Sequence, residues 1–384
     1  MFTLYYSIIS IPDTVKFRND TEFITVMAAD EKKIRIAIIV PRLIYRGPLI
    51  VMQNLVNSLF NNENFTIKVF YLDSKVEANV RMSVPVERLN PKKFNFTVYD
   101  IVHTNGIRPD LFAFINRKKI KCHISTIHNF VFEDLSFTYN RIISWFFGNV
   151  WLILWRKADK LICVSNAMKE YYSKWFSESK LEVIYNGITE TDCYQIPDID
   201  IVNVIEAYRS KGFKVTGCAA VLTKRKGIDQ LLSMVKEVSD VALVIIGNGK
   251  ELNNLKLLAE KLNISDRCLF CGFRCNAVNY FRYFDLFIVP SRSEGFGLTL
   301  VEAVQQKVPV ICSDLEVFKK LFSYNEVTFF KLDDPKSLAN ALSIAAENGK
   351  GKIEFAYKKY LNTYTADLMV EAYSKLYYKY SVSI

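Results

Sequence analysis

The chain has 384 residues, of which 50% are hydrophobic, 14% aromatic and 23% charged. This apolar content excludes a disordered chain, and 14 Gly and 10 Pro exclude a collagen-like one, while the length suffices for two or three domains. The net charge is +10, with 25 Lys and Arg against 18 Asp and Glu up to Glu190, so we expect a negatively charged partner.

Residues 1–32 precede the first run of strand character and are expected to form an N-terminal extension, with Met27 as an alternative start. They lack the basic segment and cleavage site of a signal peptide. No apolar run reaches the ~18 residues that span a bilayer. Three of the eight cysteines are close together (Cys268, Cys271 and Cys275), but the histidines are far away, so reduced thiols are a simpler interpretation than a zinc site.

From Ile34 onward, short runs rich in Val and Ile alternate with longer amphipathic stretches. Such nearly continuous apolar runs are typical of parallel strands buried on both faces. The sequence predicts a first α/β domain over 33–190, with helices at 49–60 and 166–176. Its strands are predicted at 34–40, 66–72, 99–102, 123–127, 160–164 and 182–184.

Residues 189–200 are polar and irregular and are predicted to form a linker. A second series follows over 201–360, with helices at 229–238 and 251–262. Its strands are predicted at 214–222, 241–246, 269–271, 286–289, 308–312 and 327–330. The Tyr-rich segment 361–384 is predicted to be helical and either stays with the second domain or packs back on the first. Two doubly wound α/β domains, Rossmann-like in pattern, would face each other across a cleft, where ligands bind at the carboxyl ends of parallel strands.

The segment 286–312 is the most informative for chemistry. An apolar strand ends at Pro290, a loop with two glycines follows, and a helix is predicted to begin near Leu298. Glycines at a strand-to-helix junction let backbone N–H groups approach a phosphate, which the helix N-terminus favours. Glu294 lies in the loop and Glu302 a turn into the helix. A loop carboxylate at such a helix end can accept hydrogen bonds from hydroxyls, as on a sugar or ribose, but repels the phosphate itself.

The run SRSEGFGLTLVEA resembles the E-x7-E segment of the retaining family-4 glycosyltransferases, with Glu294 and Glu302 as its two glutamates. Similar segments follow the family's order, among them LTKRKGIDQLL at 222–232, VIIGNGKE at 244–251 and FCGFRCN at 270–276. The resemblance covers about 34–380. It implies a GT-B fold in which the C-terminal domain holds a nucleotide-sugar donor and the N-terminal domain binds the acceptor.

The resemblance also implies site residues. Glu294 would contact the transferred sugar, Glu302 the ribose, and Lys226 the departing diphosphate. Family members commonly carry Arg where this chain has Val221, and Arg225, which is adjacent to Lys226, is a candidate replacement. With His128 near the transferred sugar, the expected catalytic set is Glu294, His128 and Lys226. The expected donor-binding set is Gly47, Arg225, Lys226, Gly249, Phe273, Arg274, Glu294, Gly295, Phe296, Gly297, Leu298, Thr299 and Glu302.

Three residues are acceptor-side candidates: Arg46, His103 and Asn186. No residue stands out as the base of an inverting enzyme, which agrees with retaining transfer. The D-x-D pattern at Asp198 and Asp200 lies in the predicted linker, and the family needs no such site, so no metal is expected.

The aromatic stretch 142–155 allows two interpretations: a helix buried against the first sheet, or an interfacial helix resting on a membrane. Basic residues flank it at Arg141, Arg156, Lys157 and Lys160, and these, with Lys92, Lys93 and 117–121 elsewhere, would favour anionic lipid. We therefore expect a cytoplasmic protein, peripheral on the inner membrane if the second interpretation holds.

The leading hypothesis is transfer of a hexose or N-acetylhexosamine, from a UDP-sugar in preference to GDP-mannose, to a glycan or lipid-diphosphate-linked acceptor in bacterial surface polysaccharide synthesis. The alternatives are a GT-B sugar-nucleotide epimerase and a non-catalytic sugar-nucleotide-binding or membrane-bound module. Nucleic-acid binding has only the net charge in its favour, since no motif supports it.

Overall fold

The computed structural model describes residues 33–44, 47–74, 76, 80–189 and 197–382. Residues 33–384 form one compact unit, separate from 1–32. The expected N-terminal extension and Arg46 lie outside the described residues.

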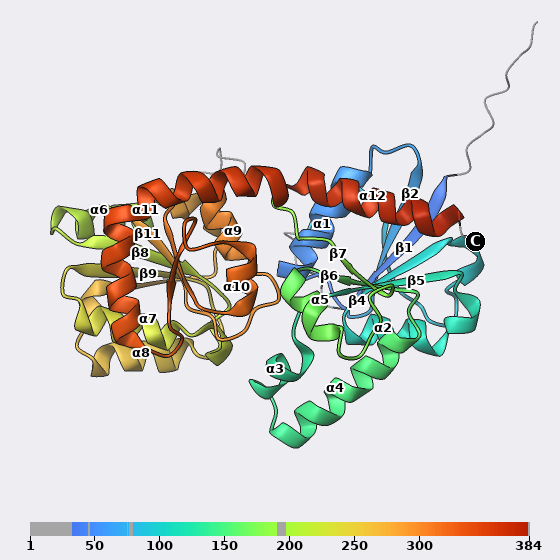
Figure 1. Ribbon diagram of the computed structural model, residues 1–384, viewed down its shortest axis with the longest axis horizontal. Coiled ribbons are helices and arrows are strands. Elements are labelled where there is room, and N and C mark those ends of the chain that lie inside the picture. Colours follow the sequence, from blue (N-terminus) through green and yellow to red (C-terminus); the bar gives the residue numbers. More distant parts are fainter. Residues whose placement is uncertain (1–32, 45–46, 75, 77–79, 190–196, 383–384) are drawn as a thin grey trace, which may run out of the picture. The chain divides into compact units, whose positions relative to one another are not determined.

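The first sheet has seven parallel strands in the order β3-β2-β1-β4-β5-β6-β7 (Figure 1). Six of them coincide within a few residues with the predicted runs, because their apolar side chains are buried on both faces of the sheet. The exception, β3, has three exposed residues and hence no apolar signal. The strands are β1 (Ile34–Val40), β2 (Phe65–Tyr71), β3 (Val86–Arg88), β4 (Ile101–Asn105), β5 (Cys122–Ile127), β6 (Lys160–Cys163) and β7 (Leu181–Val183).

The second sheet has six parallel strands in the order β10-β9-β8-β11-β12-β13. All six were predicted, two of them with the same bounds. The strands are β8 (Lys214–Ala219), β9 (Val241–Ile246), β10 (Cys268–Gly272), β11 (Leu286–Val289), β12 (Val310–Ser313) and β13 (Thr328–Phe330). Two doubly wound parallel sheets confirm the predicted fold class.

Helices connect the strands of each sheet. In the first half they are α1 (Gly47–Leu59), α2 (Ile107–Ile115), α3 (Val131–Ser136), α4 (Arg141–Arg156) and α5 (Asn166–Tyr172). In the second half they are α6 (Ile199–Ser210), α7 (Ile228–Glu237), α8 (Leu252–Lys261), α9 (Leu298–Gln305), α10 (Glu316–Leu321) and α11 (Pro335–Thr363), and α12 (Ala366–Val382) ends the described chain. The predicted linker 189–200 therefore ends earlier than expected, since α6 begins at Ile199.

Each sheet has one point at which the strand order reverses direction, between β1 and β4 in the first and between β8 and β11 in the second. At such a point the loops after two neighbouring strands run in opposite directions, and a crevice remains between them at the carboxyl edge of the sheet. Ligands of open α/β sheets bind in this crevice. Most loops with predicted site residues follow these four strands or their neighbours, whereas Phe273 and Arg274 follow β10 and Asn186 follows β7.

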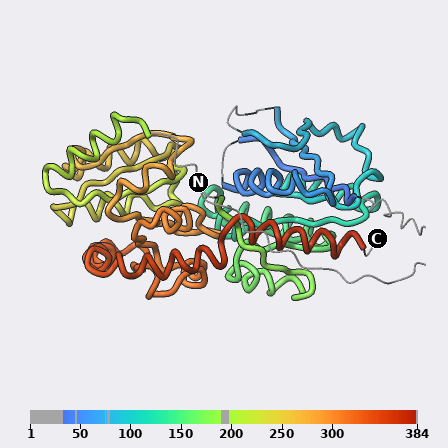
Figure 2. The backbone as a smooth tube through the Cα atoms, turned by 90° about the horizontal axis from the view of Figure 1, so that it is seen from above, coloured from blue at the N-terminus to red at the C-terminus, as the bar shows by residue number. Residues whose placement is uncertain are grey.

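The C-terminal helix α12 packs against the first half of the chain, on α1, β1 and β4. In Figure 2 the chain can be followed from α11 into α12, both red. The connection is fixed at Ile188, whose N–H donates to Tyr364 O (2.9 Å) and whose carbonyl accepts from Ala366 N (3.1 Å). On α12, Tyr373 and Tyr377 are buried against the first sheet.

Helix α4 has two different halves. It begins after Asn140, whose side chain accepts a hydrogen bond from Ile143 N. Towards its C-terminal end, the indole N–H groups of Trp151 and Trp155 both donate to the buried carboxylate of Asp110, at 2.9 Å each. Its first half instead exposes Ile142, Trp145 and Phe146, at 79, 65 and 57%. Within the described residues, no helix is long and apolar enough to cross a bilayer.

The docking of α12 can be tested with two neighbouring tyrosines. We expect Tyr377→Ala to lower the free energy of unfolding by about 3–5 kcal/mol, because it empties a buried aromatic site. Tyr377→Phe should cost about 1–3 kcal/mol, because it removes the hydroxyl that lies 2.8 Å from the buried His103 Nδ1. Unfolding in urea measures both. The control Tyr378→Ala alters a residue that is 38% exposed and whose ring centroid lies 5.0 Å from that of Phe65. It should cost clearly less than Tyr377→Ala, because part of its surface is already in water, and equal losses at the two positions would contradict the docking.

Candidate functional site

The loop after β11 places the first predicted glutamate. It runs from Pro290 to Gly297, where α9 begins. Gly297 has a φ of 90°, and a Cβ there would lie 2.4 Å from the Phe318 ring. Glycine is thus required by the backbone conformation and by the packing, and it starts α9 with its N-terminal N–H groups facing the loop.

Glu294 is almost fully buried, with 7% of its surface exposed. Its Oε1 accepts hydrogen bonds from Lys226 Nζ and from Ser291 Oγ, the latter at 2.8 Å, and its Oε2 lies 3.7 Å from Arg225. Burial opposes the charged form, but the two cations and the hydroxyl outweigh it and hold the pKa of Glu294 below its ordinary value. The side chain is therefore a buried carboxylate anion.

The two cations belong to one short turn, Lys224–Lys226, which follows β8. Gly227 ends the turn in the left-handed conformation, with φ 66°, and a Cβ there would lie 2.1 Å from Pro290 O. The turn thus packs directly on the end of β11. Val221, where the family commonly has Arg, is 42% exposed, so it is Arg225 that supplies the second cation beside Glu294.

Arg292 ties this turn to the glutamate loop, a role that sequence reasoning missed. Its N–H donates to Arg225 O at 2.7 Å, and its guanidinium donates to Lys224 O at 2.8 Å. The same guanidinium forms ion pairs with Asp229 and Asp333, whose hydrogen bonds and charges raise the pKa of Arg292. The sequence does not indicate these partners, because they lie far from Arg292 in the chain.

Glu302 lies in the second turn of α9. Burial raises its pKa to about 7, against a smaller opposing effect of Lys226. The two glutamates of the motif therefore differ in state near neutral pH, because Glu294 has close cations and Glu302 does not.

Loops of the first half contact this site. Gly295 lies against the backbone of His128, where a Cβ would be 2.1 Å from the carbonyl oxygen, and its own carbonyl accepts a hydrogen bond from Ser165 Oγ at 2.8 Å. A Cβ on Gly47, at the start of α1, would lie 3.0 Å from the Leu298 side chain. The structure thus brings Gly47 and His128 to the start of α9.

His128 pairs with a residue that the sequence did not single out. Its Nε2 lies 2.9 Å from Asn105 Oδ1, at the end of β4. Burial lowers the pKa of His128 to about 4, so the ring is neutral at pH 7. The Nδ2 of Asn105 is buried and has no hydrogen-bond partner within the described part of the chain, so it is free to donate to a ligand. A polar residue at the end of a strand can indicate a site, but the sequence predicts that this strand ends at residue 102, before Asn105.

His103 was expected to face the cleft, and the structure corrects this. It lies inside β4, fully buried, with its ring nitrogens 2.8 Å from Tyr377 Oη and 2.7 Å from Thr126 Oγ1. The reason is that β4 continues for two residues beyond His103 and α12 covers it. Asn186, the other described acceptor-side candidate, is buried after β7, next to Gly187, which packs on Thr365.

The remaining donor-side candidates follow β9 and β10. Gly249 packs on the backbone of Leu222, where a Cβ would lie 2.3 Å from the carbonyl oxygen. Phe273 is half exposed, and Arg274 donates to Asp198 at 2.7 Å. Asp198, one acid of the D-x-D pattern, is thus paired with a cation. Among the described residues no three His, Cys, Asp or Glu side chains gather as metal ligands would.

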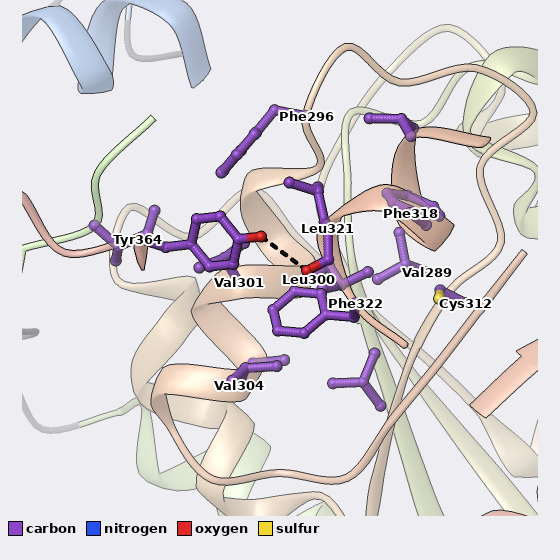
Figure 3. Close-up of a cluster of buried hydrophobic side chains, with 14 of the residues drawn as sticks. Val289, Phe296, Leu300, Val301, Val304, Cys312, Phe318, Leu321, Phe322 and Tyr364 are labelled. Atoms are coloured by element: carbon purple, nitrogen blue, oxygen red, sulfur yellow. Dashed lines mark hydrogen bonds between the residues drawn. The ribbon is translucent and has the colours of Figure 1, made fainter. Parts of the chain in front are cut away.

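Phe296 faces the core. It is 3% exposed, and its ring centroid lies 5.7 Å from that of Tyr364. Figure 3 shows it with the buried residues of α9 and α10 and with Tyr364, whose hydroxyl donates to Leu321 O at 2.8 Å. Only the backbone of Phe296 is therefore available to a ligand, while its side chain anchors the loop. Thr299 lies in the first turn of α9.

Together these groups suit a phosphorylated, hydroxyl-bearing ligand. Arg225, Lys226 and the start of α9 offer positive charge to phosphate oxygens. Hydroxyl groups of a ligand can donate to Glu294 and His128 and can accept from Asn105 Nδ2.

Two family models match the chain: "Glycosyltransferase Family 4" over residues 66–191 and "Glycosyl transferases group 1" over residues 205–362. The chain is 32% identical to the O-antigen biosynthesis glycosyltransferase WclY of Escherichia coli over 351 residues, which is 86% of this chain and 94% of the relative. It is 27% identical to the UDP-Gal:alpha-D-GlcNAc-diphosphoundecaprenol alpha-1,3-galactosyltransferase of the same species over 257 residues, 64% of this chain and 65% of the relative.

Solved structures share the fold at low identity. The sucrose-phosphate synthase of Thermosynechococcus elongatus superposes with a TM-score of 0.78 at 17% identity, covering 92% of this chain and 100% of that one. HepE of Anabaena in complex with UDP and glucose superposes with a TM-score of 0.75 at 17% identity, covering 89% and 99%.

The raised pKa of Glu302 predicts a pH-dependent stability. The folded state keeps the proton up to about pH 7, whereas the unfolded chain releases it near 4.5. The stabilisation is therefore complete below pH 4.5 and is lost as the pH rises to about 7. Glu302→Gln cannot ionise, so its stability relative to wild type should increase over this window, as measured by urea unfolding at several pH values. The control Glu260→Gln, at an exposed carboxylate of α8, should give a constant difference, and a constant difference for Glu302→Gln would refute the prediction.

Proposed function

Because the chain belongs to the family-4 glycosyltransferases of GT-B fold, we propose that it transfers a hexose or N-acetylhexosamine from a nucleotide-diphosphate sugar, preferably a UDP-sugar, with retention of configuration. The observation that carries the proposal is the buried Glu294 beside Lys226 and Arg225. This arrangement offers cations for a diphosphate next to an acceptor for sugar hydroxyls.

The proposed acceptor is a glycan or a lipid-diphosphate-linked sugar in bacterial surface polysaccharide synthesis. One relative is named for O-antigen biosynthesis, and another for transfer to a GlcNAc-diphosphoundecaprenol. These names support the pathway, and the second supports both a UDP-sugar donor and a lipid-linked acceptor.

In the proposed reaction, the bond between the sugar's anomeric carbon and the diphosphate oxygen breaks, and its electron pair stays on that oxygen. The acceptor hydroxyl oxygen bonds to the anomeric carbon from the same face, and its proton passes to the departing phosphate. Lys226 and Arg225 stabilise the negative charge that develops on the leaving group. Arg292 fixes the backbone of the turn that carries both cations, through hydrogen bonds to Arg225 O and Lys224 O.

The first half of the chain would orient the transferred sugar. His128 is neutral, and the contact with Asn105 Oδ1 assigns its proton to Nε2. Its Nδ1 is then an acceptor for a sugar hydroxyl, and Asn105 Nδ2 is a donor to another. With protein cations on the diphosphate, the proposed reaction requires no metal, so turnover should persist in EDTA.

The exposed half of α4 would place the enzyme on an anionic membrane, close to a lipid-linked acceptor. Trp145, Phe146 and Phe147 are the aromatic residues that insert at lipid interfaces. Exposed basic residues lie at both ends of α4, Arg141 at its start and Arg156–Lys157 at its end, and Lys118 and Lys119 follow α2, which packs on α4. The other two basic residues of that segment, Arg117 and Lys121, contribute less, since each pairs with an aspartate. Lys160 does not contribute, because it is buried and pairs with Glu182.

The catalytic proposal is tested by two substitutions. After a thermal-shift screen of nucleotide sugars identifies the donor, Lys226→Ala should reduce donor turnover by about 10²–10³, the usual effect of removing one group that stabilises a developing anion. Glu294→Ala should reduce turnover to a similar degree. The matched control is Lys224→Ala, which removes an exposed lysine of the same turn.

Turnover in Glu294→Ala equal to wild type would contradict the site. A wild type that binds the nucleotide sugar without turning it over would favour the non-catalytic module. Conversion of one nucleotide sugar into its epimer would identify the epimerase.

Membrane binding is tested by flotation with vesicles of mixed zwitterionic and anionic phospholipid. We expect wild type to float at low salt, and less at high salt because the charges are screened. The double substitution Trp145→Ala, Phe146→Ala should abolish flotation, while Phe355→Ala, at a residue of α11 that is 64% exposed, should leave it unchanged. Failure of wild type to float, or flotation of the double variant at the wild-type level, would exclude this surface.

A further inference from the structure

A cavity of about 420 Å³ adjoins the site at Glu294. Its walls come from both halves of the chain: from α3, from α5 and Phe130, and from the loop after β11 and the start of α10. No residue of this cavity other than Glu294 was among the predicted site residues. The cavity is therefore a neighbour of the donor-binding groups that shares one side chain with them.

The floor and the rim of the cavity differ. The buried part of the lining, here called the floor, includes Phe130, Val317 and Glu294. The rim is exposed and charged, with Glu133 and Lys174 on the first half. Tyr171 stands between them, and its ring is fixed by Phe130, with ring centroids 4.9 Å apart. The apolar and aromatic surface suits the C–H groups of a sugar ring, and the charged side chains of the rim suit its hydroxyls.

The charges argue against a phosphate in the cavity. The diphosphate-binding Arg225 and Lys226 do not line it, and Arg292, which does, already holds two aspartates. Four carboxylates line the cavity against three cations, and one of those cations, Lys320, forms an ion pair with Glu170. Carboxylates repel a phosphate but accept hydrogen bonds from hydroxyls. The fitting ligand is an uncharged carbohydrate.

We propose that this cavity binds the acceptor's terminal sugar, an inference that rests on the proposed function. Glu294 contacts the diphosphate cations through its carboxylate and also forms part of the cavity wall. Glu294 thus joins the cavity to the cations proposed for the diphosphate. A hydroxyl of a sugar bound there can approach the anomeric carbon on the side of the departing phosphate, as same-face transfer requires. Glu133 and Tyr171 determine which sugar is accepted.

Two residues of the cavity lining, Lys320 of α10 and Glu170 of α5, form an ion pair with each other. Glu170 is exposed, and exposed ion pairs contribute little to stability. An entering sugar can thus separate the two side chains at low cost and use both for hydrogen bonds to its hydroxyls.

Saturation-transfer NMR tests the cavity without knowledge of the natural acceptor. The probes are the methyl glycosides of glucose, galactose, mannose and N-acetylglucosamine, each in the presence of saturating UDP, which occupies the donor site. We expect at least one to bind wild type. Tyr171→Ala and Glu133→Gln should each weaken that binding by about tenfold, the effect of one hydrogen bond to a charged group or one lost apolar wall.

Matched controls are Tyr324→Ala and Glu178→Gln, which alter exposed residues outside the cavity and should bind as wild type. Tyr171 packs on neighbouring aromatic rings, whereas Glu133→Gln leaves the shape of the wall unchanged, so the second variant is informative even if the first is unstable. Wild-type binding in both cavity variants, or no binding of any methyl glycoside, would overturn the proposal.

Donor measurements on the same variants separate the two proposals. Donor turnover that depends on Lys226 and Glu294, together with unaffected glycoside binding in the cavity variants, would refute the cavity alone. Failure of every nucleotide sugar to stabilise the wild type would refute the proposed function itself.

Discussion

The interaction on which the site depends is the buried contact of Glu294 with Lys226 and Arg225. A carboxylate removed from water is costly unless cations compensate it, so the two loops that carry these groups have to lie together. They do because β8 and β11 are neighbours at the reversal of strand order in the second sheet. Gly227 and Arg292 then fix the loops to each other, through close backbone packing and paired hydrogen bonds.

The first half of the chain meets this centre with the equivalent edge of its own sheet. Asn105 ends β4 and His128 follows β5, and the backbone of His128 is in contact with Gly295. Parallel strands place all their carboxyl ends on one edge, which is why residues from separate loops converge there. The C-terminal helix α12 adds to this half a layer that buries His103.

The proposals assign different tasks to different surfaces of the molecule. Cations and a helix N-terminus would hold the donor diphosphate, a cavity of mixed charge would hold an uncharged acceptor sugar, and the aromatic half of α4 would contact lipid. The same physical distinction separates all three: concentrated positive charge suits phosphate, balanced charge with aromatic surface suits a carbohydrate, and exposed apolar surface with flanking cations suits a membrane.

The sequence by itself determined the two parallel sheets, because strands buried on both faces must be apolar along their whole length, and it singled out Glu294, Glu302 and Lys226 by their motif. It did not reveal β3, whose residues are exposed, or the true end of β4, which separates the buried His103 from Asn105. It left open which part of α4 is buried, and the structure buries Leu152, Leu154 and Trp155 while it exposes Ile142, Trp145 and Phe146. Only the tertiary structure decided these points, since the partners of Lys226, Arg292 and His103 lie 68, 63 and 274 residues away in the chain, and local patterns carry no record of such contacts.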